Sequence, residues 1–545
     1  MRLCGVKLTH DGGVAVIEDG ALVLSIEAEK IGNAERYSAF TDLDQVAGLL
    51  AEWDLPVESF DSIVVDGWAT DHQNQAWITT RAAGRPARLA VAPYHERGAA
   101  GADPLDRHVF DGLPLGGRTR SYTSYPHVAG HLAAAYCTSP FAARGEPSFV
   151  LVWDGPILPR LYHVDEHGKG SFVRPVLPLY GGVYAEVAMN TTPYLDARVR
   201  DNCYLSVPGK AMAYAALGVV RDDLLDAFAM AYDDLENYSS GQGTHFLQAA
   251  RRSAKADIPA ADMIATFQYF VEQRLVAALA AMIRRSGFRT RNICFAGGCA
   301  LNIHWNAAIR AAELFDEVWV PPFPNDAGSA IGTACAELLA NGISTVDWSV
   351  YAGPKLTEPS PRPGWTSRTC SPEDLGLLLH TTGDPVVVLT ERAELGPRAL
   401  GNRSILAAPV SNDMARRLNA VKDREPYRPV APLCLERRAP EVFSPGTPDR
   451  YMLFVHEVRD EWRAKVPAVV HVDGTARLQT VPEDQPWAIT RILTAYERAS
   501  GIPVLCNTSA NLNGRGFFPD VASAMDWGRL PRIWSDGVLY ERQTR

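Results

Sequence analysis

The sequence predicts an α/β protein whose N-terminal part consists of two similar halves. Residues 3–30 carry three short apolar runs, separated by THDGG and by a tight EDG turn. Residues 148–177 repeat this arrangement, with WDG after the first run and an HGKG turn before the last. Each triplet is typical of three strands joined by short turns, and helical patterns follow both. The duplicated opening favours two α/β halves that face each other across a central ligand-binding cleft.

The second half continues as an alternation of helices and strands. A long helix is predicted to end at Gly287. Its apolar residues at helical spacing are Met263, Phe267, Phe270, Val271, Leu275, Leu279 and Met282. Beyond it we expect strands at 292–298 and 317–323, each followed by a helix, at 300–314 and 327–342. In such folds the turns after the strands form the ligand-binding edge.

A segment rich in proline and glycine, residues 350–365, shows no apolar period and marks a domain boundary. A new α/β pattern begins at PVVVLTERAELGPRALG and continues to the C-terminus. We therefore predict a first domain over residues 1–350 and a second α/β domain over residues 366–545.

The composition is that of an ordinary globular chain, with 47% hydrophobic and 21% charged residues among 545. A net charge of -10 disfavours a nucleic-acid partner, because a general surface for phosphates requires a broad basic stripe. Nine cysteines without a CxxC pair suit buried thiols in a reducing compartment. The chain shows no signal peptide and no run of about 18 apolar residues, so we predict a cytoplasmic protein without membrane contact.

Four residues form a candidate metal site. His127 and His131 lie one helical turn apart in PHVAGHLAAAYC, so both imidazoles project from one helix face. Asp154 and Asp326 each follow an apolar strand, where α/β folds place ligands. This mixture of nitrogen and oxygen donors suits iron, zinc or manganese. The alternative is a pair of polar helix residues and two aspartates that cap turns.

His10 is a candidate general base. It lies in LTHDGG at the end of the first predicted strand, in a polar loop that faces the cleft. An imidazole titrates near neutrality and can accept a proton there. A structural role is the alternative for a single histidine.

Two further segments could contact a nucleotide. Lys210 follows a Pro-Gly pair at the start of an apolar helix, where its ammonium could meet a phosphate. AGGCALN places Gly297 and Gly298 between a strand and a helix, ahead of Asn302, which allows a close approach of the backbone to a ligand. A tight turn is the alternative, and the GxxxxGK[ST] loop is absent.

The C-terminal part carries a basic cluster in an otherwise acidic protein. Converging arginine and lysine side chains of this kind bind a compact dianion such as phosphate. The cluster alternates with glycine, proline and apolar residues, which is unlike the solvated basic face that is the alternative. The candidate residues are Arg398, Arg403, Lys422, Arg428, Arg477, Asn507 and Ser509.

Four stretches of the sequence are highly specific: LGPRALGNRSILAAP, NAVKDREPYRPVAP, VDGTARLQTV and GIPVLCNTSANLNG. In this order they resemble the carbamoyltransferase family of natural-product biosynthesis, which includes the tobramycin, cephamycin and nodulation-factor carbamoyltransferases. The resemblance covers essentially the whole chain. It implies a duplicated ASKHA-type, Kae-like N-terminal domain and a YrdC-like C-terminal domain.

The resemblance also implies a two-stage reaction. The YrdC-like domain would use carbamoyl phosphate and ATP, with Mg²⁺, to form carbamoyladenylate, held by the basic cluster. The Kae-like domain would transfer the carbamoyl group to an acceptor hydroxyl, with His10 as base. The HxxxH motif and the two strand-end aspartates would bind a metal, commonly iron. Lys210 and residues 297–302 would contact the nucleotide.

Some motifs depart from the family pattern. The chain has HDGGV, VWDGPIL and NTSAN where the family usually reads HDASA, VDGQGE and NTSFN. These departures lie chiefly on the acceptor side of the Kae-like cleft. The identity of the acceptor therefore transfers least directly, whereas the YrdC-side motifs are nearly intact.

The sequence thus predicts an ATP-dependent O-carbamoyltransferase that acts on a small natural product, at a sugar or polyketide hydroxyl. Threonylcarbamoylation of tRNA is an alternative against which the acidic balance counts. Hydrogenase-maturation carbamoylation is disfavoured because its zinc-finger cysteines are missing. A non-catalytic nucleotide switch of the actin and Hsp70 kind is the remaining alternative, and it has no reason to carry the arginine-rich segment.

Overall fold

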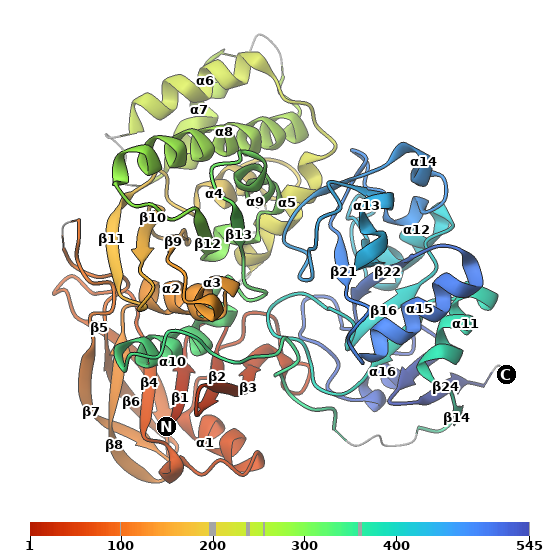
Figure 1. Cartoon of the computed structure of the whole chain (residues 1–545), viewed down its shortest axis with the longest axis horizontal. Helices are drawn as coiled ribbons and strands as arrows, with labels where there is room; N and C mark the ends of the chain where they lie inside the picture. The colour runs from red at the N-terminus through yellow and green to blue at the C-terminus, as the bar shows by residue number, and fades with distance from the viewer. Residues whose placement is uncertain (99, 196–202, 236–239, 254–256, 358–361, 544–545) are drawn as a thin grey trace.

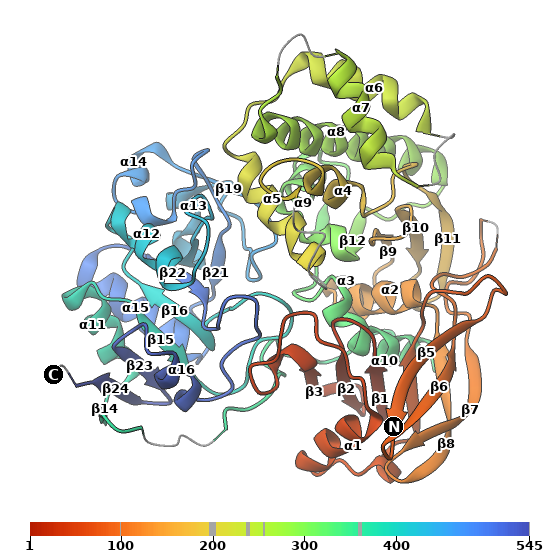
Figure 2. The same cartoon turned by 180° about the vertical axis from the view of Figure 1, so that it is seen from behind.

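The computed structural model describes residues 1–545 except 99, 196–202, 236–239, 254–256, 358–361 and 544–545 (Figure 1). Two sheets with two helices between them form the N-terminal part, and a third, larger sheet forms the C-terminal part beside them. The view from behind shows the same arrangement (Figure 2).

The first sheet has six strands in the order β3-β2-β1-β4-β8-β7. Strands β1, β2 and β3 form an antiparallel meander, and β4 runs parallel to β1 and to β8. The strands are β1 (Arg2–Lys7), β2 (Gly13–Glu18), β3 (Ala21–Glu27), β4 (Ser62–Asp66), β7 (His108–Leu115) and β8 (Arg118–Tyr125). Because β1 and β4 are parallel neighbours, their last residues, Lys7 and Asp66, come to the same edge of the sheet.

The second sheet repeats this plan in the order β11-β10-β9-β12-β13. Strands β9, β10 and β11 form the antiparallel meander, and β12 runs parallel to β9 and to β13. The strands are β9 (Ser148–Val152), β10 (Arg160–Val164), β11 (Gly170–Pro175), β12 (Asn292–Ala296) and β13 (Glu317–Trp319). The shared topology confirms the predicted α/β fold with a duplicated N-terminal part.

Helices α2 (His127–Cys137) and α10 (Ser329–Ala340) lie between the two sheets (Figure 1). They pack backbone against backbone, since a Cβ on Gly332 would lie 2.0 Å from the carbonyl oxygen of Gly130. Gly5 brings β1 equally close to α10, with a Cβ that would lie 2.0 Å from the oxygen of Ala330. This close packing brings the N-terminal ends of both helices to the edge where β1, β4 and β9 end.

A layer of helices covers the second sheet, with α8 (Ala260–Ser286) running across it (Figures 1 and 2). The apolar stripe predicted for this helix is buried at Phe267, Val271 and Leu275, and the helix ends at Gly287, whose φ is 76°. The indoles of Trp153 and Trp305 stack with centroids 5.1 Å apart beneath it. Both predictions for this segment, the helix and its glycine end, are confirmed.

Two predicted elements differ in length from those observed. The helix expected over 300–314 is a 3₁₀ turn followed by α9 (Ile303–Ala311), because the Asn302 side chain caps α9 by accepting from the amides of His304 and Trp305. Strand β13 ends at Trp319, ahead of Pro321 and Pro322, which have no amide hydrogen for a sheet. The sequence patterns also did not indicate the hairpin of β5 (Ala76–Ala82) and β6 (Arg85–Val91).

The C-terminal part is a mixed sheet of eight strands in the order β14-β24-β23-β15-β16-β22-β17-β21. The strands are β14 (Trp365–Thr369), β15 (Val386–Leu389), β16 (Arg403–Ala407), β17 (Ala431–Leu435), β21 (Gln479–Val481), β22 (Val504–Ser509), β23 (Arg532–Ser535) and β24 (Val538–Arg542). Helices α11 (Pro372–Thr382) and α15 (Ala488–Ser500) share a core with one face, whereas α12 (Asn412–Val421) and α16 (Val521–Trp527) share a core with the other.

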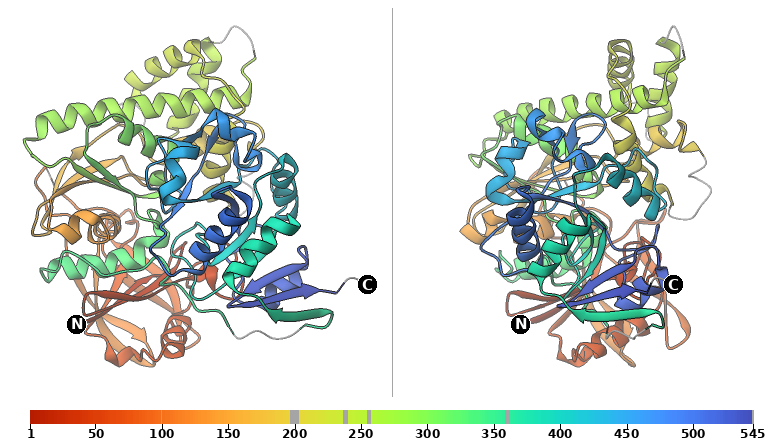
Figure 3. Two further views of the ribbon diagram at one scale, coloured as in Figure 1. Left: turned by 45° about the vertical axis from the view of Figure 1, so that its right-hand side comes forward. Right: turned by 90° about the vertical axis from the view of Figure 1, so that its right-hand side faces the viewer.

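The C-terminal part lies against both halves of the N-terminal part (Figure 3). Lys30 crosses the junction, where its Nζ donates to the carbonyl oxygens of Glu394 at 2.5 Å and Gly396 at 2.9 Å. Gly516 approaches so closely that a Cβ there would lie 1.7 Å from the oxygen of Glu29. These contacts join the two parts of the chain closely. The predicted domain boundary between residues 350 and 366 therefore stays a prediction.

Within the described residues, the helices are too short or too polar for any of them to span a membrane. The eight cysteines whose side chains the structure describes are free thiols, and seven of them are buried.

Candidate functional site

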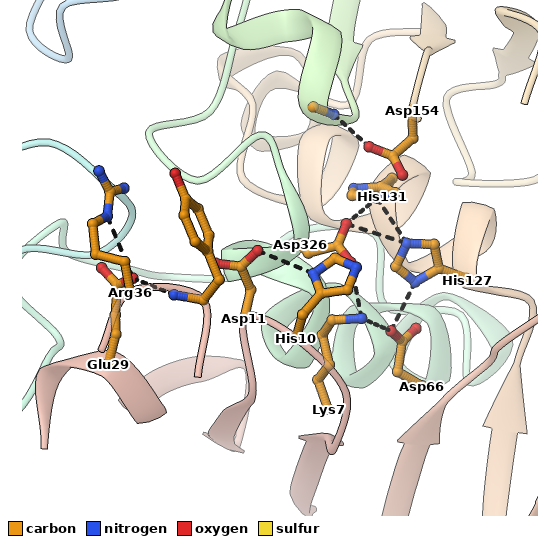
Figure 4. Close-up of polar contacts among 12 residues, drawn as sticks. Lys7, His10, Asp11, Glu29, Arg36, Asp66, His127, His131, Asp154 and Asp326 are labelled. Carbon is orange, nitrogen blue, oxygen red and sulfur yellow. Dashed lines mark hydrogen bonds and ion pairs between the residues drawn. The ribbon is translucent and has the colours of Figure 1, made fainter. Parts of the chain in front are cut away.

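The four predicted metal ligands meet at the edge where the strands end. His127 and His131 project from the first turns of α2, Asp154 follows β9, and Asp326 lies in the 3₁₀ turn ahead of α10 (Figure 4). All four side chains are buried, and one ligand atom from each lies within 4.8 Å of the others. We call these four residues, as a candidate site for a metal ion, the metal centre.

Three of the ligand atoms form a nearly equilateral triangle. His127 Nε2 lies 3.1 Å from His131 Nε2, and Asp326 Oδ1 lies 3.3 and 3.4 Å from these two nitrogens. Adjacent ligands of a six-coordinate ion with bonds of about 2.1 Å are separated by roughly 3 Å, so the triangle has the size of one face of such a site. Two histidines and a carboxylate on one face are typical of ferrous and related centres. The residues therefore fit a divalent transition metal.

Contacts with neighbouring residues orient these side chains. Asp66 Oδ2 lies 2.8 Å from His127 Nδ1, and His127 Nε2 faces His131 and Asp326. Burial lowers the pKa of His127, but the charges of Asp66 and Asp326 outweigh it and raise the pKa to about 10. Asp154 is held at both oxygens, by the amide of Gly298 at 2.7 Å and the hydroxyl of Tyr94 at 2.5 Å.

Two charged residues at this site were not singled out by the sequence patterns. Lys7 Nζ lies 3.0 Å from Asp326 Oδ2 and 3.2 Å from Asp66 Oδ2, and all three side chains are buried (Figure 4). The only signal in the sequence is that each of two apolar strands ends in a charged residue. Parallel pairing of β1 and β4 brings those ends together.

His10 lies beside the metal centre on its more exposed side. Its Nδ1 is 3.3 Å from Asp11 Oδ2, and its Nε2 is 3.6 Å from Asp326 Oδ2. Burial lowers the pKa of His10, and the hydrogen bond with Asp11 and the charge of Asp326 reverse this to a net increase. Its side chain is 27% exposed, against at most 4% for His127, His131 and Asp326, so it can meet a ligand that enters from outside.

A second site is a cavity at the junction of the N-terminal and C-terminal parts, which we call the cation cavity. Its basic lining residues are Arg36, Arg398, Lys422, Arg424, Arg428, Arg477 and Arg515. Asn507, Ser509 and Asn511 also line it. Arg36, Met212 and His304 come from the N-terminal part, so both parts of the chain form its walls.

The positive charge of the residues that line the cation cavity exceeds the negative charge of the carboxylates that line it. Burial and the charges of Arg36 and Arg428 lower the pKa of Arg398 to about 10. Burial and neighbouring arginines lower the pKa of Arg424 to about 9. The buried Nε atoms of Arg398 and Arg477 have no hydrogen-bond partner within the described part of the protein. Unpartnered donors on repelling cations fit a bound polyanion.

Arg403 is not among the residues that line this cavity. Its guanidinium is buried and donates to the carbonyl oxygens of Thr390 at 2.6 Å, Asn402 at 2.9 Å and Glu391 at 3.1 Å. These bonds join the first residue of β16 to the loop that follows β15 and carries Arg398. A role of Arg403 in binding carbamoyl phosphate or the nucleotide stays a prediction.

Lys422 lines the cavity but is largely used within the protein. Its Nζ donates to the carbonyl oxygens of Ser509 and Asn511, both at 2.6 Å, and to the Asn511 side chain. Burial, together with the charges of Arg424 and Arg428, holds its pKa well below the usual value. Arg424, which the sequence patterns did not single out, donates to Thr508 Oγ1 at 2.9 Å and lines the cavity.

The predicted nucleotide-contacting residues lie in three different places. Lys210 is 3.7 Å from Glu425 at the rim, next to Gly209 of the cavity wall. The amide of Gly298 donates to Asp154. Gly297, with a φ of 89°, allows the chain to turn after β12. Asn302 caps α9. A nucleotide-binding role for these residues stays a prediction.

A loop joins the two sites. Arg36 of the cation cavity lies 3.7 Å from Glu29, whose carboxylate accepts from the amide of Tyr37 at 3.1 Å. The backbone carbonyl oxygen of Tyr37 in turn accepts from the amide of Asp11 at 3.2 Å, next to His10 in the sequence. The cavity and the metal centre are thus connected through Glu29, Arg36 and Tyr37 and through the hydrogen bond from the Asp11 amide to Tyr37.

Comparisons with known proteins show the family to which the chain belongs. Residues 2–335 match the family described as carbamoyltransferase N-terminus, and residues 379–530 match the carbamoyltransferase C-terminus. Nodulation protein U of Rhizobium tropici is 48% identical over 562 residues, which covers 100% of this chain and 96% of the relative. The 3'-hydroxymethylcephem-O-carbamoyltransferase of Amycolatopsis lactamdurans is 32% identical, over 95% of this chain and 94% of the relative. With both family models matched in order and relatives aligned along the whole length, the chain belongs to the carbamoyltransferase family and is an enzyme of that kind.

Proposed function

We propose that the protein is an ATP-dependent O-carbamoyltransferase that consumes carbamoyl phosphate and modifies a hydroxyl of a small natural product. The observation that carries the ATP and carbamoyl phosphate dependence is the cation cavity. Its arginines repel one another, and two of their buried Nε donors have no partner among the residues that the structure describes, so the cavity is complementary to phosphate groups.

The first half-reaction belongs in this cavity. Water cleaves carbamoyl phosphate to carbamate and phosphate, and a carbamate oxygen then attacks the α-phosphorus of ATP. Pyrophosphate leaves with the electron pair, and carbamoyladenylate remains. Arg398, Arg424 and Arg477 hold the phosphate groups and stabilise the charge that moves onto their oxygens. Mg²⁺ would accompany ATP.

The second half-reaction belongs at the metal centre. The acceptor oxygen attacks the carbamoyl carbon, the bond from that carbon to the adenylate oxygen breaks, and AMP leaves. His10 Nε2 takes the hydroxyl proton, while Asp11 holds Nδ1. A bound divalent ion, proposed here as Fe²⁺, would supply Lewis-acid stabilisation of the charge that develops in this step. His127, His131, Asp154 and Asp326 would hold it.

The relatives support a small-molecule acceptor. One of them is named for O-carbamoylation of 3'-hydroxymethylcephem, and others are named for nodulation. The family assignment disfavours both tRNA threonylcarbamoylation and a non-catalytic nucleotide switch. A sugar or polyketide hydroxyl is the acceptor that we propose for this chain.

The test is to supply carbamoyl phosphate, Mg-ATP and an acceptor alcohol and to measure release of phosphate, pyrophosphate and AMP. The wild-type protein should release all three. Arg398→Ala should slow pyrophosphate release by about 10²-fold or more, because it removes a donor to the transferring groups. Arg368→Ala, a surface arginine paired with Glu541, is the matched control and should behave as wild type. Absence of pyrophosphate release from folded, metal-loaded wild-type protein would overturn the proposal.

A further inference from the structure

Lys7 is a buried lysine for which the proposed reaction has no use. It ends β1, and it shares a strand face with Leu3 and Gly5, because alternate residues of a strand point the same way. Gly5 lies against α10 on this face. Lys7 therefore points between the ends of β1 and β4 and the turn that precedes α10.

The ammonium of Lys7 is buried beside the metal centre, among Asp326, Asp66 and Trp68. Its Nζ lies 3.0 Å from Asp326 Oδ2 and 3.2 Å from Asp66 Oδ2, and the Trp68 ring centroid is 4.7 Å away. The Lys7 side chain is 0% exposed. It cannot touch a substrate, so any contribution to the reaction must act through its carboxylate partners.

Each of these carboxylates has one oxygen turned toward Lys7. With Oδ2 of Asp326 paired to the lysine, Oδ1 faces the Nε2 atoms of His127 and His131. Asp66 Oδ2 contacts both the Lys7 ammonium and His127 Nδ1. One ammonium thus sets the orientation of two of the four ligands, Asp326 directly and His127 through Asp66.

The position of the ammonium between two carboxylates supports the same role. Lys7 Nζ lies between Asp66 and Asp326, and all three side chains are buried. A cation there offsets the repulsion between two carboxylates in low-dielectric surroundings.

We propose that Lys7 is a positioning residue that keeps Asp326 a single-oxygen ligand and, through Asp66, fixes His127 for the metal. This inference rests on the proposed metal centre. Without the Lys7 ammonium, both oxygens of Asp326 could bind the metal ion. The second oxygen would then occupy a coordination position that the reacting groups need.

The test uses Co²⁺, whose visible absorption depends on the number and arrangement of its ligands. Metal-free wild-type protein, Lys7→Met and Lys30→Met are each loaded with Co²⁺, and stoichiometry and spectrum are recorded. Lys30 is the matched control because it is also buried, pairs with Glu27 at 2.7 Å and lies outside the metal centre. Phosphate and pyrophosphate release and transfer to an acceptor alcohol are measured on the same samples.

Lys7→Met should bind Co²⁺ with an altered spectrum and should transfer about 10–100-fold more slowly, with pyrophosphate release within twofold of wild type. Lys30→Met should give the wild-type spectrum. A wild-type spectrum and transfer rate for Lys7→Met would overturn the inference alone. Failure of the wild-type protein to bind Co²⁺ would overturn the proposed metal centre, and this inference with it.

The variant Asp66→Asn provides a second test. It leaves fewer buried charges unpaired than Lys7→Met does. It preserves the side-chain size and the Lys7 pair with Asp326, but removes the carboxylate shared with His127. Its Co²⁺ spectrum should change and its affinity for Mn²⁺ should fall about tenfold. Wild-type values for both would contradict a role of the Lys7 and Asp66 pair in positioning His127.

Discussion

The Tyr94 hydroxyl donates a hydrogen bond of 2.5 Å to Asp154, the proposed metal ligand from the second half of the N-terminal part. Burial and the negative charge of Asp154 raise the pKa of Tyr94 well above its usual value, so the hydroxyl stays protonated and remains a donor. The Tyr94 ring also packs on His127, with centroids 4.6 Å apart. One tyrosine therefore contacts ligands from both halves.

Tyr94→Phe should lower the affinity of the metal centre for its ion and leave ligand binding in the cation cavity unchanged. Asp154 would keep the Gly298 amide but lose its second partner, and we expect metal affinity to fall about tenfold. Metal titration and pyrophosphate release measure the two sites separately. Tyr122→Phe, which loses a hydroxyl bonded to the carbonyl of Ala90, is the control. Equal loss of both half-reactions in Tyr94→Phe would contradict separate sites.

Arg477→Met should make the ligand-free protein more stable and less active. Burial and the charges of Arg398 and Arg424 hold the pKa of Arg477 well below its usual value, so its positive charge opposes folding. Removing it should raise the free energy of unfolding by about 1–2 kcal/mol. Denaturant unfolding checks this sign, and phosphate release should fall sharply. A destabilised but active variant would show that Arg477 has a structural role.

Gly516→Ala should force the two parts of the chain apart. A Cβ at this position would lie 1.7 Å from the oxygen of Glu29, so the backbone of one part must move. Overpacking of this kind costs about 1–3 kcal/mol, and it should widen the cation cavity beside Arg515. Thermal unfolding and the KM for carbamoyl phosphate measure the two effects. Gly514→Ala tests backbone strain alone, because Gly514 has a φ of 76° with open space around it.

Glu272 should make stability depend on pH away from either site. Burial raises its pKa from 4.5 to about 7. The folded state then binds more protons than the unfolded state between these values, so stability falls as pH rises from 4.5 through 7. Glu272→Gln should remove this loss and stabilise the protein by about 1–2 kcal/mol at pH 8, with little effect at pH 4.5. Unfolding curves at both pH values test the sign.

The sequence predicted the parts of the site that lie within one element or follow a strand. His127 and His131 are one turn apart on α2, and both aspartates follow apolar strands, so local patterns sufficed. Lys7 and Asp66 are 59 residues apart and meet through strand pairing, which no local pattern displays. The sequence does not show that the Arg403 guanidinium turns toward the carbonyl oxygens of its own loop, because the direction of a long side chain depends on the folded backbone.

The same distinction holds for the fold. The two meanders and α8 follow from alternating and helical apolar spacing, and the structure contains them. The side-by-side placement of Gly130 and Gly332 could not be predicted, because it depends on two helices that are about 200 residues apart in the chain. Arg36 was missed for the same reason, since its loop reaches the cavity only after the two parts dock.

The walls of the cation cavity have a consequence for how the enzyme can be divided. Arg36, Met212 and His304 face Arg398 and Arg477 across it, so a C-terminal fragment produced by itself would present half of a binding surface to solvent. If the chain were cut between the two segments that match the family models, the two fragments would have to associate before the cavity could form. The adenylation that we propose would then depend on protein concentration, as in an enzyme of two subunits.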